Sequence, residues 1–303
     1  MSERVLGVSF SLHRCSELGL PKKRVLQAAL KDLGFRRFRL MSYWDIHEQR
    51  YGRYDFRELD WQLDMVAKYN GQVSLCLGAR QPRWPEFHLP TWVKSLDDET
   101  AYNGLMSYIR KVVLRYKDHP ALQSWQLENE AMLKSFADNS RGTYDRDRLK
   151  KERWFVGHSD KHKHPVIMTL SDSWGIPWRD PKPDAYGMSI YRLTMNPAGQ
   201  VFHDKRSPRF YANRAKLIHV IKRRPTFIHE LQAEPWFSRP ILSVSVDEQL
   251  AQMSVKQIQA IVDFALTTGL SPIDLWGLEW WYYLKTNHHP EIWETIRGFV
   301  QQA

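Results

Sequence analysis

The sequence predicts an α/β protein, a single (β/α)8 TIM barrel in which residues 1–303 form one domain. Short apolar, β-prone runs alternate with helical segments eight times along the chain, a rhythm typical of parallel strands covered by helices. The length of 303 residues and the hydrophobic content of 43% suit one barrel of this kind. No glycine-rich dinucleotide or phosphate loop follows an early strand, and the eight-fold count favours a closed barrel over an open sheet.

The first half of the chain contains four strands, each followed by a helical pattern. Pro21–Phe35 has apolar residues at helical spacing, Asp55 caps the second helix, and a third helix carries Leu105 to Val113 on one face. A loop at Gly78–Leu96, dense in proline and aromatic residues, is longer than usual connections and is therefore expected to be functional. The strands are expected at Val5–Ser11, Arg37–Tyr43, Gln72–Leu77 and Leu122–Glu128.

The second half repeats the alternation. Helices are expected around Arg146–Trp154, at Arg209–Arg223 and over Leu250–Val262, and the last helix opens with Pro290, which a first helical turn tolerates. The four remaining strands are expected at Val166–Leu170, Ala185–Ile190, Phe227–Glu230 and Ile273–Leu278.

Charge and composition narrow the class of protein. The net charge is +10, but the basic residues are spread over separate predicted helices, so we expect no nucleic-acid partner. The two cysteines suit a reducing compartment. Since no signal-peptide pattern precedes the apolar run Val5–Phe10 and no apolar run approaches membrane-spanning length, we expect a cytoplasmic protein without a membrane partner. The sequence predicts no particular oligomeric state.

Two strand ends carry carboxylates. The buried run Ser124–Ala131 breaks off in Glu128, Asn129 and Glu130, and the seventh strand ends at Glu230. Carboxylates at the end of an apolar strand have to be solvated, paired or used in chemistry. In a barrel, both would face the same mouth at the carboxyl ends of the strands, as cleavage of a glycosidic bond requires.

The chain resembles clan A of the glycoside hydrolases, the barrel enzymes that include cellulases, mannanases and β-galactosidases. The resemblance lies in Asn129-Glu130 after strand four, Glu230 at the end of strand seven and Arg39 on strand two. The segment from Tyr43-Trp44 through Gly52–Phe56 is similar to the one that follows strand two in β-galactosidase-like members. His229-Glu230 departs from the more usual Thr-Glu of the clan.

The resemblance implies a retaining β-glycoside hydrolase that acts on β-linked oligo- or polysaccharides by double displacement. Glu130 would be the general acid and base and Glu230 the nucleophile, with carboxyl groups about 5 to 5.5 Å apart. Arg39 and Tyr191 would hold Glu230 ionised, and Asn129 would bind the sugar 2-hydroxyl. The partner is then a carbohydrate substrate, and no organic cofactor or metal is required.

Further substrate-binding candidates are aromatic or polar residues expected on loops at the strand ends. Indole rings stack on the apolar faces of sugars, although aromatic residues also dominate ordinary cores. The loop after strand three adds residues that could line the site or simply brace the loop. The candidates are Trp44, Arg80, Gln81, Trp84, Trp174, Trp236, Trp280 and Trp281.

Two other functions remain open at this stage. One is a glycan-binding barrel that has lost catalysis, which keeps the tryptophans but needs no spaced pair of carboxylates. The other is a metal-dependent barrel hydrolase that uses the histidines at 158, 162 and 164, although their lysine-rich surroundings would repel a cation. Glu128, Glu234 and Glu279 are rival carboxylates for the catalytic roles.

Overall fold

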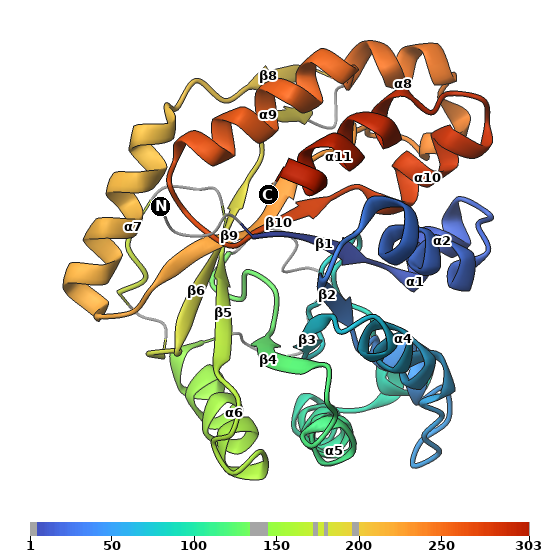
Figure 1. The fold of residues 1–303 in the computed structure, drawn as a ribbon. Helices are drawn as coiled ribbons and strands as arrows, with labels where there is room; N and C mark the ends of the chain where they lie inside the picture. The colour runs from blue at the N-terminus through green and yellow to red at the C-terminus, as the bar shows by residue number, and fades with distance from the viewer. Residues whose placement is uncertain (1–4, 134–144, 172–174, 179–180, 196–199, 303) are drawn as a thin grey trace.

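The structure is a computed structural model that describes residues 5–133, 145–171, 175–178, 181–195 and 200–302. Eight parallel strands form a closed barrel in the order β1-β10-β9-β6-β5-β4-β3-β2, which confirms the predicted (β/α)8 TIM barrel. In Figure 1 the helices lie around the outside of the strands. The barrel strands are β1 (Leu6–Phe10), β2 (Arg37–Met41), β3 (Gln72–Leu77), β4 (Leu122–Leu127), β5 (Val166–Leu170), β6 (Ala185–Ile190), β9 (Thr226–Gln232) and β10 (Ile273–Trp276).

The helices pack their apolar faces on the strands. Their buried residues recur at three- and four-residue spacing, as Ile109, Val112 and Val113 do in α5. The helices are α1 (Leu12–Glu17), α2 (Lys22–Ala28) with the π-helix Ala29–Leu33, α3 (Trp44–His47), α4 (Arg57–Lys68), α5 (Asp98–Tyr116), α6 (Arg146–Ser159), α7 (Pro208–Lys222), α8 (Val246–Gln252), α9 (Val255–Thr267), α10 (Leu278–Thr286) and α11 (Glu291–Gln302).

The strand predictions are confirmed at all eight positions, with ends that differ by at most two residues. One such difference is at the end of the last strand. The strand ends at Trp276 instead of Leu278, because Gly277 has a φ of 144° and turns the chain directly into α10. The hairpin of β7 (Leu193–Met195) and β8 (Val201–His203) was not predicted. Its strands are three residues long, too short for an alternating pattern to be recognised.

The barrel interior contains a cluster of buried polar side chains. Arg37 donates from Nε to Oδ1 of Asp274 at 2.8 Å, and His229 is hydrogen-bonded to Oδ2 of the same carboxylate. Burial alone would raise the pKa of Asp274, but the charge of Arg37 and the His229 hydrogen bond lower it to about 2. Gly7 leaves the space that this buried cluster occupies.

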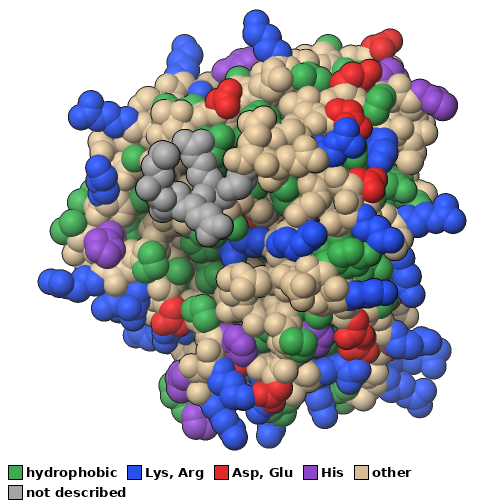
Figure 2. Space-filling view, viewed as in Figure 1, with side chains coloured by type: hydrophobic (Ala, Val, Ile, Leu, Met, Phe, Trp, Pro, Cys, Tyr) green, Lys and Arg blue, Asp and Glu red, His purple; other side chains and the backbone are tan. Residues whose placement is uncertain are grey.

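Charged side chains are distributed over the surface. Figure 2 shows Lys and Arg side chains projecting at many points around the outline, with Asp and Glu between them. Some of these charges pair with each other, as Arg115 does with Asp60 at 2.7 Å. Among the described helices, none combines the length and the apolar character that a membrane crossing would need.

We predict that Gly7→Ala destabilises the barrel. The added Cβ would overlap the Asp274 carboxylate and lie 2.9 Å from Cγ of Arg37, and neither can retreat without breaking their ion pair. We expect a loss of roughly 1–3 kcal/mol in the free energy of unfolding, the usual cost of overpacking. Urea denaturation followed by circular dichroism measures it.

Gly298→Ala is the matched control. Its Cβ would meet no atom within 4 Å on α11, so alanine should raise stability by up to about 1 kcal/mol through helix propensity. Equal effects of the two substitutions would contradict the proposed packing around Asp274.

Candidate active site

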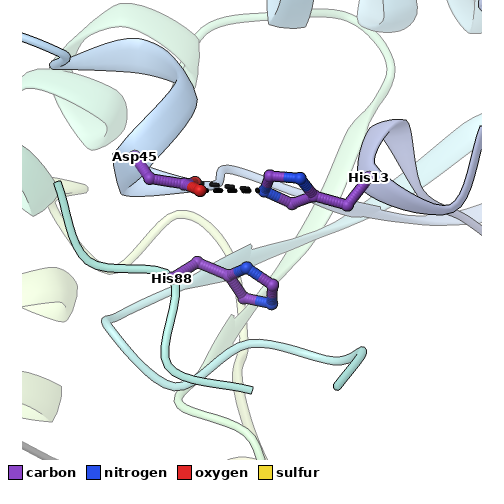
Figure 3. A group of neighbouring side chains, drawn as sticks. All are labelled: His13, Asp45 and His88. Carbon is purple, nitrogen blue, oxygen red and sulfur yellow. Dashed lines mark hydrogen bonds and ion pairs between the residues drawn. The ribbon is translucent and has the colours of Figure 1, made fainter. Parts of the chain in front are cut away.

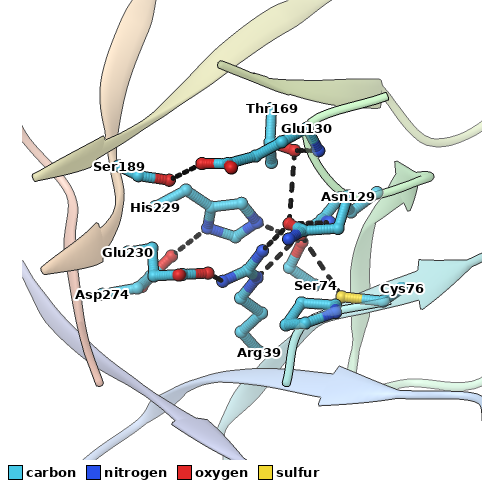
Figure 4. Close-up of polar contacts among 12 residues, drawn as sticks. Arg39, Ser74, Cys76, Asn129, Glu130, Thr169, Ser189, His229, Glu230 and Asp274 are labelled. Atoms are coloured by element: carbon cyan, nitrogen blue, oxygen red, sulfur yellow. Dashed lines mark hydrogen bonds and ion pairs between the residues drawn. The ribbon is translucent and has the colours of Figure 1, made fainter. Parts of the chain in front are cut away.

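Polar side chains from four strands meet at the carboxyl ends of the barrel strands. Arg39 lies on β2, Glu130 follows β4, Tyr191 follows β6 and Glu230 lies near the end of β9. Figure 4 shows Glu130 and Glu230 reaching into the same space from opposite sides of the barrel, with Asn129 between β4 and Arg39. The four strands that sequence analysis singled out therefore deliver their polar residues to one mouth.

Glu230 is held by two donors. Nη1 of Arg39 forms an ion pair with Oε2 of Glu230, and the Tyr191 hydroxyl donates to Oε1 at 2.5 Å. Arg39 is fully buried, and although burial opposes its charge, the charge of Glu230 raises the pKa of Arg39.

Arg39 also orients the residues of β4. Its Nε donates to Oε1 of Gln126 at 2.7 Å and its Nη2 donates to Oδ1 of Asn129 at 2.9 Å. These bonds fix which way the Asn129 amide points, because the oxygen faces Arg39. Within the described residues the Asn129 amide nitrogen donates to no group, so it is available to a ligand.

Glu130 has a different environment. Within the described part of the chain, its carboxyl is hydrogen-bonded by one side chain, Ser189, whose Oγ donates to Oε1 at 2.6 Å. Burial first, and then the negative charge of Glu230, raise the pKa of Glu130 well above its ordinary value. Glu130 has a φ of 45°, in the left-handed region that costs a non-glycine residue roughly 1–3 kcal/mol.

The backbone of Glu130 is braced in this strained conformation. Its N–H donates to Oγ1 of Thr169 at 2.7 Å, and its carbonyl accepts from Nη1 of Arg80 at 3.0 Å. The site therefore contains two carboxyl groups in different environments, one paired with a buried arginine and one whose raised pKa favours its protonated form. Such a pair can donate a proton to a leaving group on one side of a bond and present a nucleophile on the other.

Two predicted binding residues in the loop after β3 have structural partners. Arg80 is buried and pairs with Glu86 at 2.5 Å, and Gln81 donates to the carbonyl of Ser42 at 2.6 Å. Burial raises the pKa of Glu86 to about 7, even against the opposing charge of Arg80. Trp84 in the same loop is 68% exposed. The loop thus presents Trp84 outward while Arg80 and Gln81 brace it.

Three predicted tryptophans lie in the core instead of the site. Trp44 packs against Trp92 and Tyr108, and its indole nitrogen donates to Glu48 at 2.7 Å. Trp280 and Trp281 are fully buried on α10, because the eighth strand ends four residues before Trp280. None of the three exposes an indole face on which a sugar could stack.

Trp236 is placed differently, and Trp174 lies outside the described residues. Trp236 is 39% exposed, and its ring meets the Tyr191 ring edge-on with centroids 5.4 Å apart. Because the Tyr191 hydroxyl is hydrogen-bonded to Glu230, Trp236 lies at the border of the site. Its partial exposure leaves one part of the indole ring accessible.

The rival carboxylates are engaged elsewhere. Glu128 accepts the backbone N–H groups of Ala79 and Arg80, and burial raises its pKa. Glu234 and Glu279 both pair with Arg83. All three side chains are buried in these contacts.

Sequence reasoning missed Ser189, Arg83 and Trp276. The Arg83 guanidinium stacks on the ring of Trp276, which ends the eighth strand, with 4.0 Å to the ring centroid. A serine inside an apolar strand and an arginine inside a long loop carry no pattern that identifies them. Trp276 could have been found as the last apolar residue before Gly277.

The histidines of the predicted lysine-rich turn do not converge. His158 stacks on Trp154, and Nδ1 of His164 lies 3.0 Å from Asp160. Among the described residues, one group could hold a metal ion, formed by His13, Asp45 and His88. It includes none of the turn's histidines, so the structure gives no support to the metal-dependent alternative built on them.

No family model and no curated protein matches the chain. Solved structures match the chain in fold, at low sequence identity. GH5_18 from Bifidobacterium longum subsp. longum superposes with a TM-score of 0.70 at 11% identity, over 99% of this chain and 79% of that one. The exo-beta-1,4-mannosidase Op5Man5 from Opitutaceae bacterium strain TAV5 has a TM-score of 0.64 at 14% identity. The match covers 99% of this chain and 59% of the mannosidase chain.

A β-galactosidase from the haloarchaeon Halorubrum lacusprofundi has a TM-score of 0.57 at 15% identity, over 90% of this chain and 52% of that one. The chain has a clan A glycoside hydrolase-like fold. It spans between half and three fifths of the length of the galactosidase and the mannosidase, so each of those chains has a large part without a counterpart here. At these identities the likeness concerns the fold.

We predict that Ser189→Ala raises the pKa of Glu130 further. The Ser189 hydroxyl stabilises the ionised form of Glu130, so its loss favours the protonated form and moves the titration to higher pH. The pKa can be measured by 13C NMR of protein labelled at the glutamate side-chain carboxyl carbon, with the Glu130 signal assigned from a Glu130→Gln variant.

Ser124→Ala is the control for this measurement. It removes another buried strand hydroxyl, one that has no hydrogen-bond partner in the described residues. The pKa of Glu130 should be the same in this variant as in the wild type. A downward shift in Ser189→Ala, or equal shifts in both variants, would refute the assigned hydrogen bond.

Proposed function

We propose that the protein is a retaining β-glycoside hydrolase in which Glu230 is the nucleophile and Glu130 the general acid and base. The observation that carries the proposal is the contrast between the two carboxyl groups. Glu230 is paired with the buried Arg39, whereas the Glu130 carboxyl accepts a hydrogen bond from the Ser189 hydroxyl and has a raised pKa. A retaining glycosidase needs this division between a nucleophilic carboxylate and a protonated acid.

In the first step, a carboxylate oxygen of Glu230 forms a bond to the anomeric carbon as the bond from that carbon to the leaving oxygen breaks. Glu130 transfers its proton to the leaving oxygen, which departs as an alcohol. Arg39 and Tyr191 hold the Glu230 carboxyl group and aim it at the sugar. The product of the step is a glycosyl ester on Glu230.

In the second step, water hydrolyses this ester. Esterification removes the negative charge of Glu230, which is one cause of the raised pKa of Glu130. Glu130, now ionised, takes a proton from water as the water oxygen bonds to the anomeric carbon and the Glu230 carboxylate leaves. The sugar is released with its original configuration, and Glu130 is protonated again.

Two further residues suit substrate binding. The free amide nitrogen of Asn129 can donate to the sugar 2-hydroxyl, a contact that strengthens in the transition state. The accessible face of Trp236 beside Tyr191 offers a stacking surface for a sugar ring next to the scissile bond. Trp84, exposed on the loop after β3, is a second candidate surface.

The structural neighbours suggest which substrates to test. They include an exo-beta-1,4-mannosidase, β-galactosidases and a GH5_18 protein in complex with Manb1-4GlcNAc. We therefore propose a carbohydrate substrate with a β-linked mannosyl or galactosyl unit. A panel of aryl β-glycosides and the disaccharide Manβ1-4GlcNAc covers these sugars.

We predict that Glu230→Gln abolishes turnover of whichever substrate in the panel the wild type cleaves. An amide cannot form the glycosyl ester, so kcat should fall at least about 10³-fold, as it does when a covalent nucleophile is removed. Release of the aryl alcohol followed by absorbance measures the rate.

Glu234→Gln is the matched control, because Glu234 is another buried glutamate beyond the same strand but pairs with Arg83 instead of Arg39. It should retain turnover if the folded protein is recovered. Substantial activity in Glu230→Gln with the fold intact would refute the nucleophile assignment.

We predict that the loss of rate caused by Glu130→Ala depends strongly on the leaving group of the substrate. A disaccharide needs a proton on its leaving oxygen, whereas an activated aryl group leaves without one, so the first step should slow far more for the disaccharide. General acid catalysis is typically worth 10²–10⁴-fold, so a difference on the order of 10²-fold is expected. Pre-steady-state rates on both substrates measure it, and equal losses would contradict the role.

A further inference from the structure

Three side chains from the segments that follow the first three strands converge at the carboxyl end of the barrel. His13 lies on α1 after β1, Asp45 on α3 after β2, and His88 in the long loop after β3. One ligand atom of each lies within 4.8 Å of those of the others. Figure 3 shows the Asp45 carboxylate pointing at the His13 ring, with the His88 ring beside the pair.

The contacts of the group fix which atoms face its centre. Nε2 of His88 lies 3.1 Å from the carbonyl of Arg83 and can only donate to it, so Nδ1 carries the lone pair of this ring. Nε2 of His13 lies 3.1 Å from both oxygens of Asp45. The carboxylate and the His13 nitrogen therefore share one proton, and a cation can replace that proton.

The surroundings hold these groups in place. The rings of His13 and His88 stack at 4.7 Å between centroids, and Tyr43 contacts both rings edge-on. The N–H of Asp45 donates to the carbonyl of His88 at 3.2 Å. His88 is 5% exposed, while the side chains of His13 and Asp45 are about one third exposed. The group is therefore buried on the side of His88 and accessible to solvent on the side of His13 and Asp45.

We propose that His13, Asp45 and His88 form a binding site for a divalent transition metal ion of the zinc class. Two imidazoles and one carboxylate are a donor set that such ions prefer, with a fourth position left for water. Ligand atoms at about 2.0–2.1 Å from a tetrahedral ion lie roughly 3.4 Å apart, so the three groups need only close inward. The hydrogen bond from His88 to Arg83 orients its ring, as outer contacts of metal-bound histidines do.

A bound ion would link the loops after the first three strands. One of these loops carries Arg83, which pairs with Glu234 and stacks on Trp276 beside the candidate active site. The ion would therefore stiffen one wall of the barrel mouth without touching Glu130 or Glu230. The inference does not rest on the proposed function, since metal binding is measured without substrate.

The test uses Co²⁺ on the full chain after treatment with a chelator. Zinc gives no visible spectrum, whereas Co²⁺ in a site of low coordination number absorbs in the visible. We expect saturable one-to-one binding with visible bands, bleaching when one equivalent of Zn²⁺ displaces the Co²⁺, and a rise in Tm with Zn²⁺. His13→Gln and Asp45→Asn should each weaken Co²⁺ affinity at least about tenfold.

His158→Gln is the matched control, since it removes an exposed histidine outside the group and should leave binding unchanged. Circular dichroism verifies that each variant is folded. Absence of saturable one-to-one binding by the wild type would overturn the proposal. Binding that survives unchanged in both His13→Gln and Asp45→Asn would overturn it as well, because the ion would then sit elsewhere.

Discussion

The ion pair between Arg39 and Glu230 is the interaction on which the site depends. A fully buried guanidinium is costly unless it is hydrogen-bonded, and here each of its three nitrogens donates to one side chain, Gln126, Glu230 or Asn129. These bonds connect β2 with β4 and β9, strands that do not neighbour β2 in the barrel. One arginine thus sets the position of a carboxylate and of an amide on opposite sides of the mouth.

Similar ion pairs between arginine and carboxylate side chains recur along the barrel axis. Residues two apart on a strand face the same side, so Arg37 and Arg39 both point into the barrel while Phe38 faces the helices. Arg37 neutralises Asp274 in one layer, Arg39 neutralises Glu230 in the next, and Arg83 pairs with two glutamates beyond the strand ends. The interior therefore contains a series of arginine–carboxylate pairs, and within the described residues Glu130 forms no such ion pair.

The strands and the catalytic candidates could be predicted because their signals are local. Apolar runs that end in Asn129-Glu130 and Glu230 stand out in the sequence, and Arg39 was found through family resemblance. Trp280 and Trp281 were predicted at the end of a strand but lie on α10. The transition from strand to helix depends on one residue, Gly277, whose backbone conformation the apolar pattern does not reveal. Ser189, Trp276 and the group of His13, Asp45 and His88 depend on contacts between distant segments, which no spacing along the chain reveals.

The stereochemistry of the first product tests the central claim most directly. Wild-type protein can be mixed with the best aryl β-glycoside of the panel in D₂O and the anomeric proton followed by NMR within the first minutes. The double displacement through Glu230 predicts that the β-anomer of the free sugar appears first and then mutarotates. Initial release of the α-anomer would mean direct attack by water, and would contradict a nucleophilic role for the Arg39-bound carboxylate.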